Sequence, residues 1–311
     1  MKYMKGDENI MENDYMVRAS AAGGQIRAFA VTARGVAEEA RKAHNTFPVA
    51  TAALGRLMCA ALMMGDMLKS EKDLITVRVD GDGPLGGIVV TADNSGNVKG
   101  YVKNTDVIVP ARPDKHLNVG AAVGNGTLTV IRDMGLKEPY VGQVALHSGE
   151  IADDLTYYYA ESEQVPSSVG LGVLMSKENT VRHAGGFIVQ LMPGAEENVI
   201  SRLEQNIAGL PYVTELLQRG LDPEGMLKEV LYGFDVDMNG RREVHFRCNC
   251  SRERVERALM LLPRKELDDI ISDGETIELK CEFCNKGYDF SINDLKKIRE
   301  TVEKSKRKDV E

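Results

Sequence analysis

The sequence predicts an α+β fold with three parts: an N-terminal mixed sheet-and-helix domain, a helical linker and a small C-terminal domain with four cysteines. Three observations predict it. Strand-like segments follow one another in runs while helical segments are grouped, which favours α+β over a doubly wound sheet. Short apolar helical stretches, interrupted by prolines and glycines, follow Pro193. Four of the five cysteines lie after residue 240.

The N-terminal part shows strand signals with grouped helix signals. Tyr15–Ala21 and Gln25–Thr32 flank a Gly-Gly pair, which predicts a β-hairpin. Ala33–His44 and Pro48–Lys69 are expected to be helices, because Ala and Leu fill the interior of the second and a proline suits its first turn. The segments that follow are predicted as one helix, Ile151–Ser162, and as strands at Leu74–Asp80, Gly87–Thr91, Val98–Val102, Thr127–Arg132, Val141–Leu146, Val169–Met175 and Phe187–Met192.

Changes in residue composition and hydrophobic pattern along the chain set the predicted domain boundaries. Residues 1–11 are expected to be a flexible N-terminal tail, because they are polar and precede a possible alternative start at Met11. Residues 12–193 form the predicted N-terminal α+β domain, and residues 194–239 the helical linker. Residues 240–311 form the predicted C-terminal domain, which ends in a charged tail from Glu303 to Glu311.

Bulk composition argues against several classes of protein. The net charge is -8 and the pI about 5.4, so no overall basic excess points to nucleic acid or an anionic membrane. No window holds the 18 or more uninterrupted apolar residues of a membrane span. The first fifteen residues lack the apolar core of a signal peptide. We therefore expect a reducing, cytoplasmic location, where paired cysteines are more often metal-binding or redox-active than structural.

The four C-terminal cysteines predict a zinc site. Cys248-Asn249-Cys250 and Cys281-Glu282-Phe283-Cys284 are separated by thirty residues. Four thiolates are a common tetrahedral ligand set for one structural zinc ion, and a helical insert, Arg252–Leu262 followed by Pro263–Ile271, can bring the two pairs together. The C-x-x-C half is ordinary for zinc, whereas C-x-C gives an unusually tight chelate. The alternatives are cysteines without a ligand and a zinc ion with a structural role only.

The same thiolates can also serve as a redox switch. Thiolates are the nucleophilic, oxidisable form of cysteine. Peroxide or hypochlorous acid can convert one to a sulfenic acid, which a neighbouring cysteine resolves as a disulfide. The metal then loses its donors. Because metal binding in small modules is largely folding free energy, on the order of 10 kcal/mol or more, this segment is expected to unfold.

Other candidate sites have plainer interpretations. Cys59 lies in an apolar helix and is expected to be buried and inert. The string Gly81-Asp82-Gly83-Pro84-Leu85-Gly86 matches G-x-G-x-x-G, but a strand pattern follows it instead of a helix, so a turn is expected. His245 could be a spare metal ligand, although four thiolates already fill a tetrahedron. No catalytic motif stands out, and no enzymatic activity is expected.

These residues resemble a known family. The runs Cys248–Arg254, Cys281–Asn285 and Tyr288–Phe290 are similar to the zinc module of the 33 kDa chaperonin family, the redox-regulated heat-shock holdases. Upstream segments resemble the N-terminal domain of that family in the right order, and the resemblance covers nearly the whole chain from about Met11. These upstream segments are Gly81–Pro84, Val123–Gly126, and Gly185–Phe187 through Met192-Pro193.

The resemblance implies a function and a mechanism. Reduced protein with one zinc ion on Cys248, Cys250, Cys281 and Cys284 would be an inactive monomer. Oxidative stress would form Cys248–Cys250 and Cys281–Cys284 disulfides, release zinc and unfold the linker. The activated homodimer would hold unfolding client proteins without ATP, as a chaperone that assists protein folding. Clients would bind apolar surface on the N-terminal domain and the destabilised linker.

Two further classes of protein were weighed. A zinc-ribbon nucleic-acid binder would use the basic residues Arg252, Arg254 and Arg257 and those of the tail. Residues 241–311, however, hold 17 Lys+Arg against 16 Asp+Glu, which a solvated mixed-charge surface explains better. A thiol–disulfide oxidoreductase would use the C-x-x-C pair, but the strand–helix context of thioredoxins is not evident. Neither nucleic acid nor a membrane is therefore expected as a partner.

Overall fold

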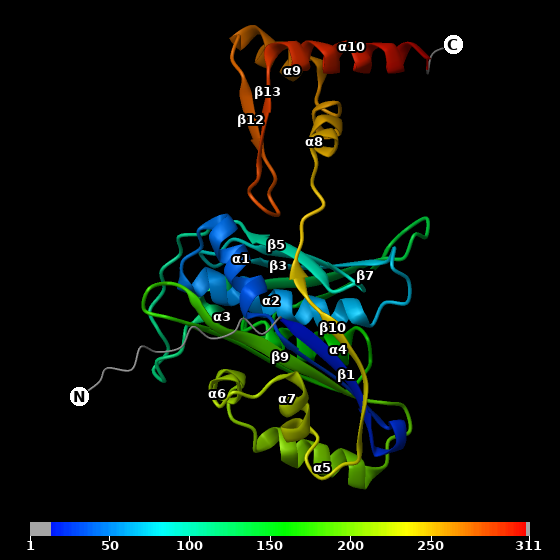
Figure 1. The fold of residues 1–311 in the computed structure, drawn as a ribbon. Helices are drawn as coiled ribbons and strands as arrows, with labels where there is room; N and C mark the ends of the chain where they lie inside the picture. The colour runs from blue at the N-terminus through cyan, green and yellow to red at the C-terminus, as the bar shows by residue number, and fades with distance from the viewer. Residues whose placement is uncertain (1–13, 309–311) are drawn as a thin grey trace, which may run out of the picture. The chain divides into compact units, whose positions relative to one another are not determined.

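The chain consists of two compact units, of which one ends at Arg247 and the other begins at Cys248. The structure is a computed structural model that describes residues 14–308, with side chains through residue 302 (Figure 1). The predicted tail of residues 1–11 lies outside the described residues. An α+β fold with a separate four-cysteine segment is confirmed, and each unit is described by itself.

A five-stranded antiparallel sheet forms one layer of the N-terminal unit. Its order is β10-β1-β2-β9-β8. β1 and β2 form the predicted hairpin, in register from Tyr15↔Thr32 to Ala21↔Ile26, and the turn between them needs Gly23, whose φ is +64°. The strands are β1 (Tyr15–Ala21), β2 (Ile26–Thr32), β8 (Ser167–Met175), β9 (Val181–Leu191) and β10 (Val236–Glu243).

A six-stranded sheet forms the second layer, in the order β11-β5-β4-β3-β6-β7. The predicted turn over Gly81–Gly86 joins β3 to β4 and is confirmed as a turn. A Cβ on Gly81 would lie 1.9 Å from the carbonyl oxygen of Val123, so this turn requires glycine. The strands are β3 (Leu74–Gly81), β4 (Ile88–Asp93), β5 (Asn97–Val102), β6 (Gly126–Asp133), β7 (Tyr140–Ala145) and the short parallel β11 (His245–Phe246).

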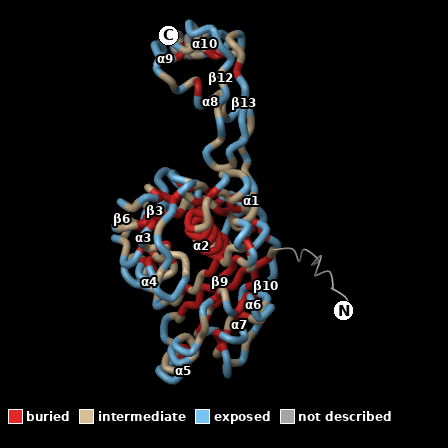
Figure 2. The backbone as a smooth tube through the Cα atoms, turned by 90° about the vertical axis from the view of Figure 1, so that its left-hand side faces the viewer, coloured by how far each residue is buried: buried red, intermediate tan, exposed pale blue. Residues whose placement is uncertain are grey.

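Helix α2 (Pro48–Asp66) lies between the two sheets and is buried almost all round, as the central red coil of Figure 2 shows. It is long and apolar enough to cross a membrane by length and composition, but 89% of its most apolar window is buried inside the protein. It is therefore the core helix of the unit. The other helices of this part are α1 (Arg34–His44), the short α3 (Val119–Val123), which was not predicted, and α4 (Ala152–Glu161).

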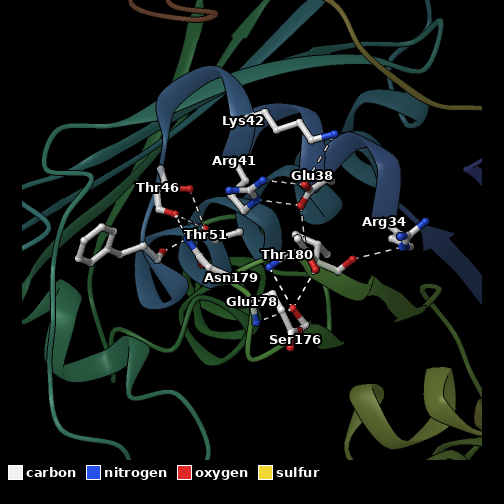
Figure 3. A network of polar contacts seen from close by, with 12 residues as sticks. Arg34, Glu38, Arg41, Lys42, Thr46, Thr51, Ser176, Glu178, Asn179 and Thr180 are labelled. Atoms are coloured by element: carbon white, nitrogen blue, oxygen red, sulfur yellow. Dashed lines mark hydrogen bonds and ion pairs between the residues drawn. The ribbon is translucent and has the colours of Figure 1, made fainter.

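Polar contacts attach α1 to the turn between β8 and β9. The Glu38 carboxylate accepts hydrogen bonds from Arg41 and, at 3.0 Å, from the backbone N–H of Val181 (Figure 3). Asn179 donates from the same turn to the carbonyl oxygen of Thr46, at 3.2 Å. Burial opposes ionisation of Glu38, but the hydrogen bonds from Arg41, the larger effect, lower its pKa.

The expected linker folds as three helices on the face of the five-stranded sheet opposite α2 (Figure 1). Apolar residues of these helices, among them Leu203, Leu216 and Leu227, pack with Val17 and Ala28 of the sheet in one buried cluster. The linker helices are α5 (Glu197–Ala208), α6 (Val213–Gln218) and α7 (Pro223–Val230).

The expected boundary at residues 239 and 240 falls inside strand β10. This strand pairs with β1 over its whole length, with a bulge opposite Arg18 and Ala19. Its sequence, VDMNGRRE, is polar and almost fully exposed, so its pattern gives little strand signal. The contact pattern thus places the end of the first unit at Arg247, eight residues beyond the predicted end of the linker.

The C-terminal unit is small and has a thin core. The buried apolar side chains among its described residues are Leu259, Leu267, Phe290, Leu295 and Ile298. The hairpin β12–β13 and the full extent of α10 were not predicted, and α10 includes part of the expected charged tail. The elements are α8 (Arg252–Leu259), α9 (Arg264–Asp273), β12 (Ile277–Lys280), β13 (Gly287–Phe290) and α10 (Ile292–Lys308).

Candidate metal centre

Two separate arms of the C-terminal unit carry the four cysteines. Cys248 and Cys250 lie in an extended segment that ends where Ser251 caps α8, its hydroxyl accepting the backbone N–H of Arg254 at 3.3 Å. Cys281 and Cys284 lie in the turn between β12 and β13. The helical insert and the hairpin together bring the two arms to one place, as the spacing predicted.

The turn that carries Cys281 and Cys284 has the shape of a knuckle. The carbonyl oxygen of Cys281 accepts hydrogen bonds from the backbone N–H groups of Cys284 (3.3 Å) and Asn285 (2.7 Å). The N–H of Cys281 donates to the carbonyl oxygen of Lys286, at 3.0 Å. Asn285 takes a left-handed conformation with φ of +57°, which asparagine tolerates better than most residues. The two thiols of this turn therefore point to one side on a fixed backbone.

The four Sγ atoms lie within 4.8 Å of one another and could hold a metal ion. Two separations join the arms: 3.7 Å between Sγ of Cys248 and Sγ of Cys281, and 3.4 Å between Sγ of Cys250 and Sγ of Cys284. A tetrahedral zinc ion with Zn–S bonds of about 2.3 Å separates its sulfurs by about 3.8 Å. A disulfide bond would require about 2.05 Å, so the geometry is that of four reduced thiols around a common centre.

Tyr288 on β13 is a contact of the site that sequence reasoning did not assign. Its hydroxyl donates a hydrogen bond to Sγ of Cys250, at 3.1 Å. Burial opposes ionisation of Cys250, but this hydrogen bond and those from the other thiols outweigh it and lower the pKa of Cys250 to about 7. The same hydrogen bond raises the pKa of Tyr288 to about 12. Burial raises the pKa values of Cys248 and Cys284. The arrangement therefore favours a first thiolate at Cys250.

Arg252 connects the first arm to the hairpin beside the site. Its guanidinium donates to the carbonyl oxygen of Asp289 and, at 3.0 Å, to the carboxylate of Asp294. It also lies over the ring of Phe290, 4.4 Å from the centroid, in a cation–π contact. The sequence placed Arg252 at the start of the helical insert and in a basic run, and it did not indicate these contacts with the hairpin.

The other candidate residues lie outside this cluster. Cys59 is fully buried in α2, and burial raises the pKa of its thiol, which agrees with the expected inert role. The side chain of His245 is 56% exposed, with Nε2 3.8 Å from a carboxylate oxygen of Glu243, and it is not one of the clustered residues.

Together these features define a class of protein: a layered α+β unit joined to a small module with four clustered thiols. Comparison with known proteins narrows this class. The Hsp33 protein family model matches residues 14–291. The 33 kDa chaperonin of Agathobacter rectalis is 54% identical over 287 residues, which cover 92% of this chain and 100% of the relative. That of Clostridioides difficile is 51% identical over 286 residues, covering 92% of this chain and 98% of the relative.

A solved structure agrees with these relatives. The crystal structure of the 33 kDa chaperonin (heat shock protein 33 homolog) of Thermotoga maritima superposes with a TM-score of 0.86 at 35% identity, covering 93% of this chain and 98% of the other. The chain therefore belongs to the Hsp33 family of chaperones. The predicted resemblance is confirmed.

Proposed function

We propose that this chain is a redox-regulated, ATP-independent holdase that binds unfolding proteins during oxidative stress and is not an enzyme. One observation carries the proposal: four thiols from two arms gather within 4.8 Å in a unit whose own apolar core is thin. Such a unit depends on a cross-link or a metal for its fold. Chemistry that removes the metal therefore removes the fold as well.

The ligands of the proposed site are Cys248, Cys250, Cys281 and Cys284, with one zinc ion in the reduced protein. Four soft sulfur donors at tetrahedral spacing suit zinc. Bound zinc supplies folding free energy, on the order of 10 kcal/mol for small modules. The Tyr288 hydroxyl and the Arg252 contacts hold the arms in place around it.

Oxidation by peroxide is proposed to proceed in two balanced steps. A thiolate attacks peroxide and becomes a sulfenic acid, while peroxide is reduced to water. A second thiol then displaces the sulfenic oxygen as water and forms the disulfide. The family resemblance pairs Cys248 with Cys250 and Cys281 with Cys284, and both partners of each pair belong to one arm. The disulfides leave no thiolate donors for the metal.

Release of the linker is the proposed activating step. Helices α5, α6 and α7 cover an apolar face of the five-stranded sheet, where they bury side chains such as Val17, Ala28 and Val189. If the linker unfolds, this face and the apolar faces of the helices become accessible. An exposed patch of this kind suits unfolded client proteins. The oxidised form is proposed to act as a homodimer in the cytoplasm, without nucleic acid or membrane partners.

The test combines metal, thiol and chaperone measurements on the full chain. Reduced protein is expected to contain one zinc ion and five free thiols. After peroxide at raised temperature it should contain no zinc and one thiol, Cys59, and should suppress light scattering by a heat-denatured client. Peptide mapping then tests the disulfide pairing. The holdase function is contradicted if the oxidised protein leaves client scattering unchanged.

A further inference from the structure

The segment between the linker helices and the cysteines occupies the edge of a sheet. We define Val236–Arg247 as the strap. Its strand β10 pairs with β1 along all seven residues of β1. The strap then crosses to the second sheet, where Val244 is buried and β11 adds two residues beside β5. Cys248 follows directly. The strap is therefore the part of the first unit nearest in sequence to the four cysteines.

Few side chains hold β10 in place. Seven of its eight residues are exposed, and Val236 is partly buried. Backbone pairing is supplemented by polar contacts of its side chains, among them an ion pair of Arg241 with Glu224 at 4.0 Å. Arg242 donates to the Asp66 carboxylate at 3.0 Å, Arg241 lies 3.6 Å from the ring centroid of Tyr15, and Asn239 donates to Ser20 at 2.9 Å. A strand held mainly by backbone hydrogen bonds can be replaced by another strand.

Strand β1 beneath it is different, because one of its faces is apolar along its whole length, whereas the other carries Met16, Arg18 and Ser20. Tyr15, Val17, Ala19 and Ala21 are buried on the face covered by the linker helices, and Met16 is buried on the face towards α2. Without β10, this strand would become a free edge with unpaired N–H and C=O groups and one continuous apolar face. Such an edge is a template for an added strand.

A charged group beside this edge restricts what can bind there. Asp66 ends α2 and is 9% exposed. Its carboxylate contacts Arg242 at 3.0 Å and Arg18 at 3.8 Å, at the base of a small surface pocket on the seam between β1 and β10. When β10 leaves, Asp66 loses the nearer cation. A strand that replaces β10 is then favoured if it carries Lys or Arg at the position opposite Met16, where Arg242 lies.

We infer that the β1 edge is a client-binding site that captures an extended segment of an unfolded protein as an added antiparallel strand in place of β10. The inference rests on the proposed function, which frees the linker. The favoured segment is about seven residues long, with apolar residues alternating on the face that the helices uncover and a basic residue on the other face. This class of segment is hidden in folded proteins and accessible in unfolding ones.

Synthetic heptapeptides test the inference on the oxidised full chain. The probe is a fluorescein-labelled peptide of alternating valine and threonine, with arginine at the sixth position, opposite Met16. Two matched peptides carry N-methyl groups on alternate residues. In one peptide the amides on the strand edge that pairs with β1 are blocked, and in the other the amides on the outward edge are blocked. We expect methylation of the amides that face β1 to weaken binding about 100-fold, and methylation of the outward amides to change it less than about 3-fold.

Charge gives a second readout. Replacing the peptide arginine by glutamate should weaken binding to the unaltered protein about 10-fold, and Asp66→Asn should remove most of that discrimination. Equal binding of the two methylated peptides overturns the inference, because it indicates apolar adsorption without strand pairing. A dimer that exchanges β10 between copies and excludes the peptide also overturns it.

Suppression of client aggregation is measured on the same samples, so that the two proposals can fail separately. If the protein suppresses client aggregation but binds the two methylated peptides equally, the edge site is refuted and the holdase function stands. If peptide binding depends on which amides are methylated but client aggregation is not suppressed, the edge site is supported and the holdase function is refuted. If the oxidised protein neither binds the peptide nor protects the client, both are refuted.

Discussion

The two units of this chain differ in how many apolar side chains they bury. The N-terminal unit packs α2 between two sheets and buries a second apolar cluster beneath the linker helices. The described part of the C-terminal unit, through residue 302, buries five apolar side chains across its small hairpin and helices. A single core in a unit of this size rarely supplies more than about 3–5 kcal/mol, so a bound metal can decide whether the unit is folded. The difference fits the proposed function, in which the N-terminal unit is the scaffold and the C-terminal unit responds to the state of four sulfur atoms.

Loss of one of the four clustered cysteines should have the largest effect on zinc affinity and on the fold of the C-terminal unit. Cys284→Ser removes one of the four donors, so we expect the apparent zinc affinity to fall on the order of 1,000-fold or more and the C-terminal unit to unfold. Competition with a chromophoric chelator measures the affinity. Cys59→Ala is the matched control, because it removes a thiol from the core of the other unit and should leave zinc binding unchanged. If Cys284→Ser still binds one zinc ion tightly, the C-terminal unit does not depend on all four thiols, and the proposed contrast between the two units is contradicted.

Removal of the largest side chain from the small core should come next. Phe290 is fully buried and lies beneath Arg252, so Phe290→Ala should destabilise the C-terminal unit by about 3–5 kcal/mol. Because the proposed function links metal binding to folding in this unit, zinc affinity should fall roughly 100-fold or more. Zinc titration monitored by circular dichroism checks both effects. An unchanged affinity would mean that the metal site forms independently of the core.

A matched cavity in the scaffold should act locally. Leu62 is fully buried in α2, and Leu62→Ala should lower the free energy of unfolding of the N-terminal unit by about 2–5 kcal/mol. The zinc content and the zinc affinity should not change. Thermal unfolding followed by zinc analysis measures both. If Leu62→Ala releases zinc from the reduced protein, the two units do not fold as separately as proposed.

The smallest effect concerns pH and the polar contacts of α1. The Arg41 hydrogen bonds lower the pKa of Glu38 in the folded protein, so ionised Glu38 stabilises the fold at neutral pH. This contribution is complete above its ordinary pKa of 4.5 and is lost as the pH falls through the lower folded value. Glu38→Gln should cost about 1 kcal/mol at pH 7 and less at acidic pH, as judged by thermal unfolding. A cost that grows towards acid pH would contradict the assignment.

The sequence predicted most elements of the scaffold because their patterns coincide with burial. The hairpin of β1 and β2 and the apolar helix α2 both bury the residues that carried the signal. Strand β10 was missed because its residues are polar and exposed, and it is a strand only through backbone pairing with β1. The five-residue helix α3 is too short to show a helical period.

The sequence also predicted most of the candidate site, as it did most elements of the scaffold. Cysteine spacing identified the four thiols that the fold brings together, because two close pairs of cysteines are a pattern that can be read directly from the sequence. The hydrogen bond from Tyr288 to Cys250 and the contacts of Arg252 could not be inferred, since they depend on how β13 folds beside the first arm. The pairing Cys248–Cys250 and Cys281–Cys284 stays a prediction, because the four sulfurs lie at similar separations.

Hydrogen exchange on the full chain, before and after metal removal, tests the central claim most directly. Under reducing conditions a chelator should abolish amide protection in α8, α9 and the β12–β13 hairpin, while α2 and strands β2 and β9 keep theirs. That result means that the metal alone maintains the fold of the C-terminal unit. Protection of the C-terminal amides that survives metal removal would contradict it, because the unit would then fold on its own core.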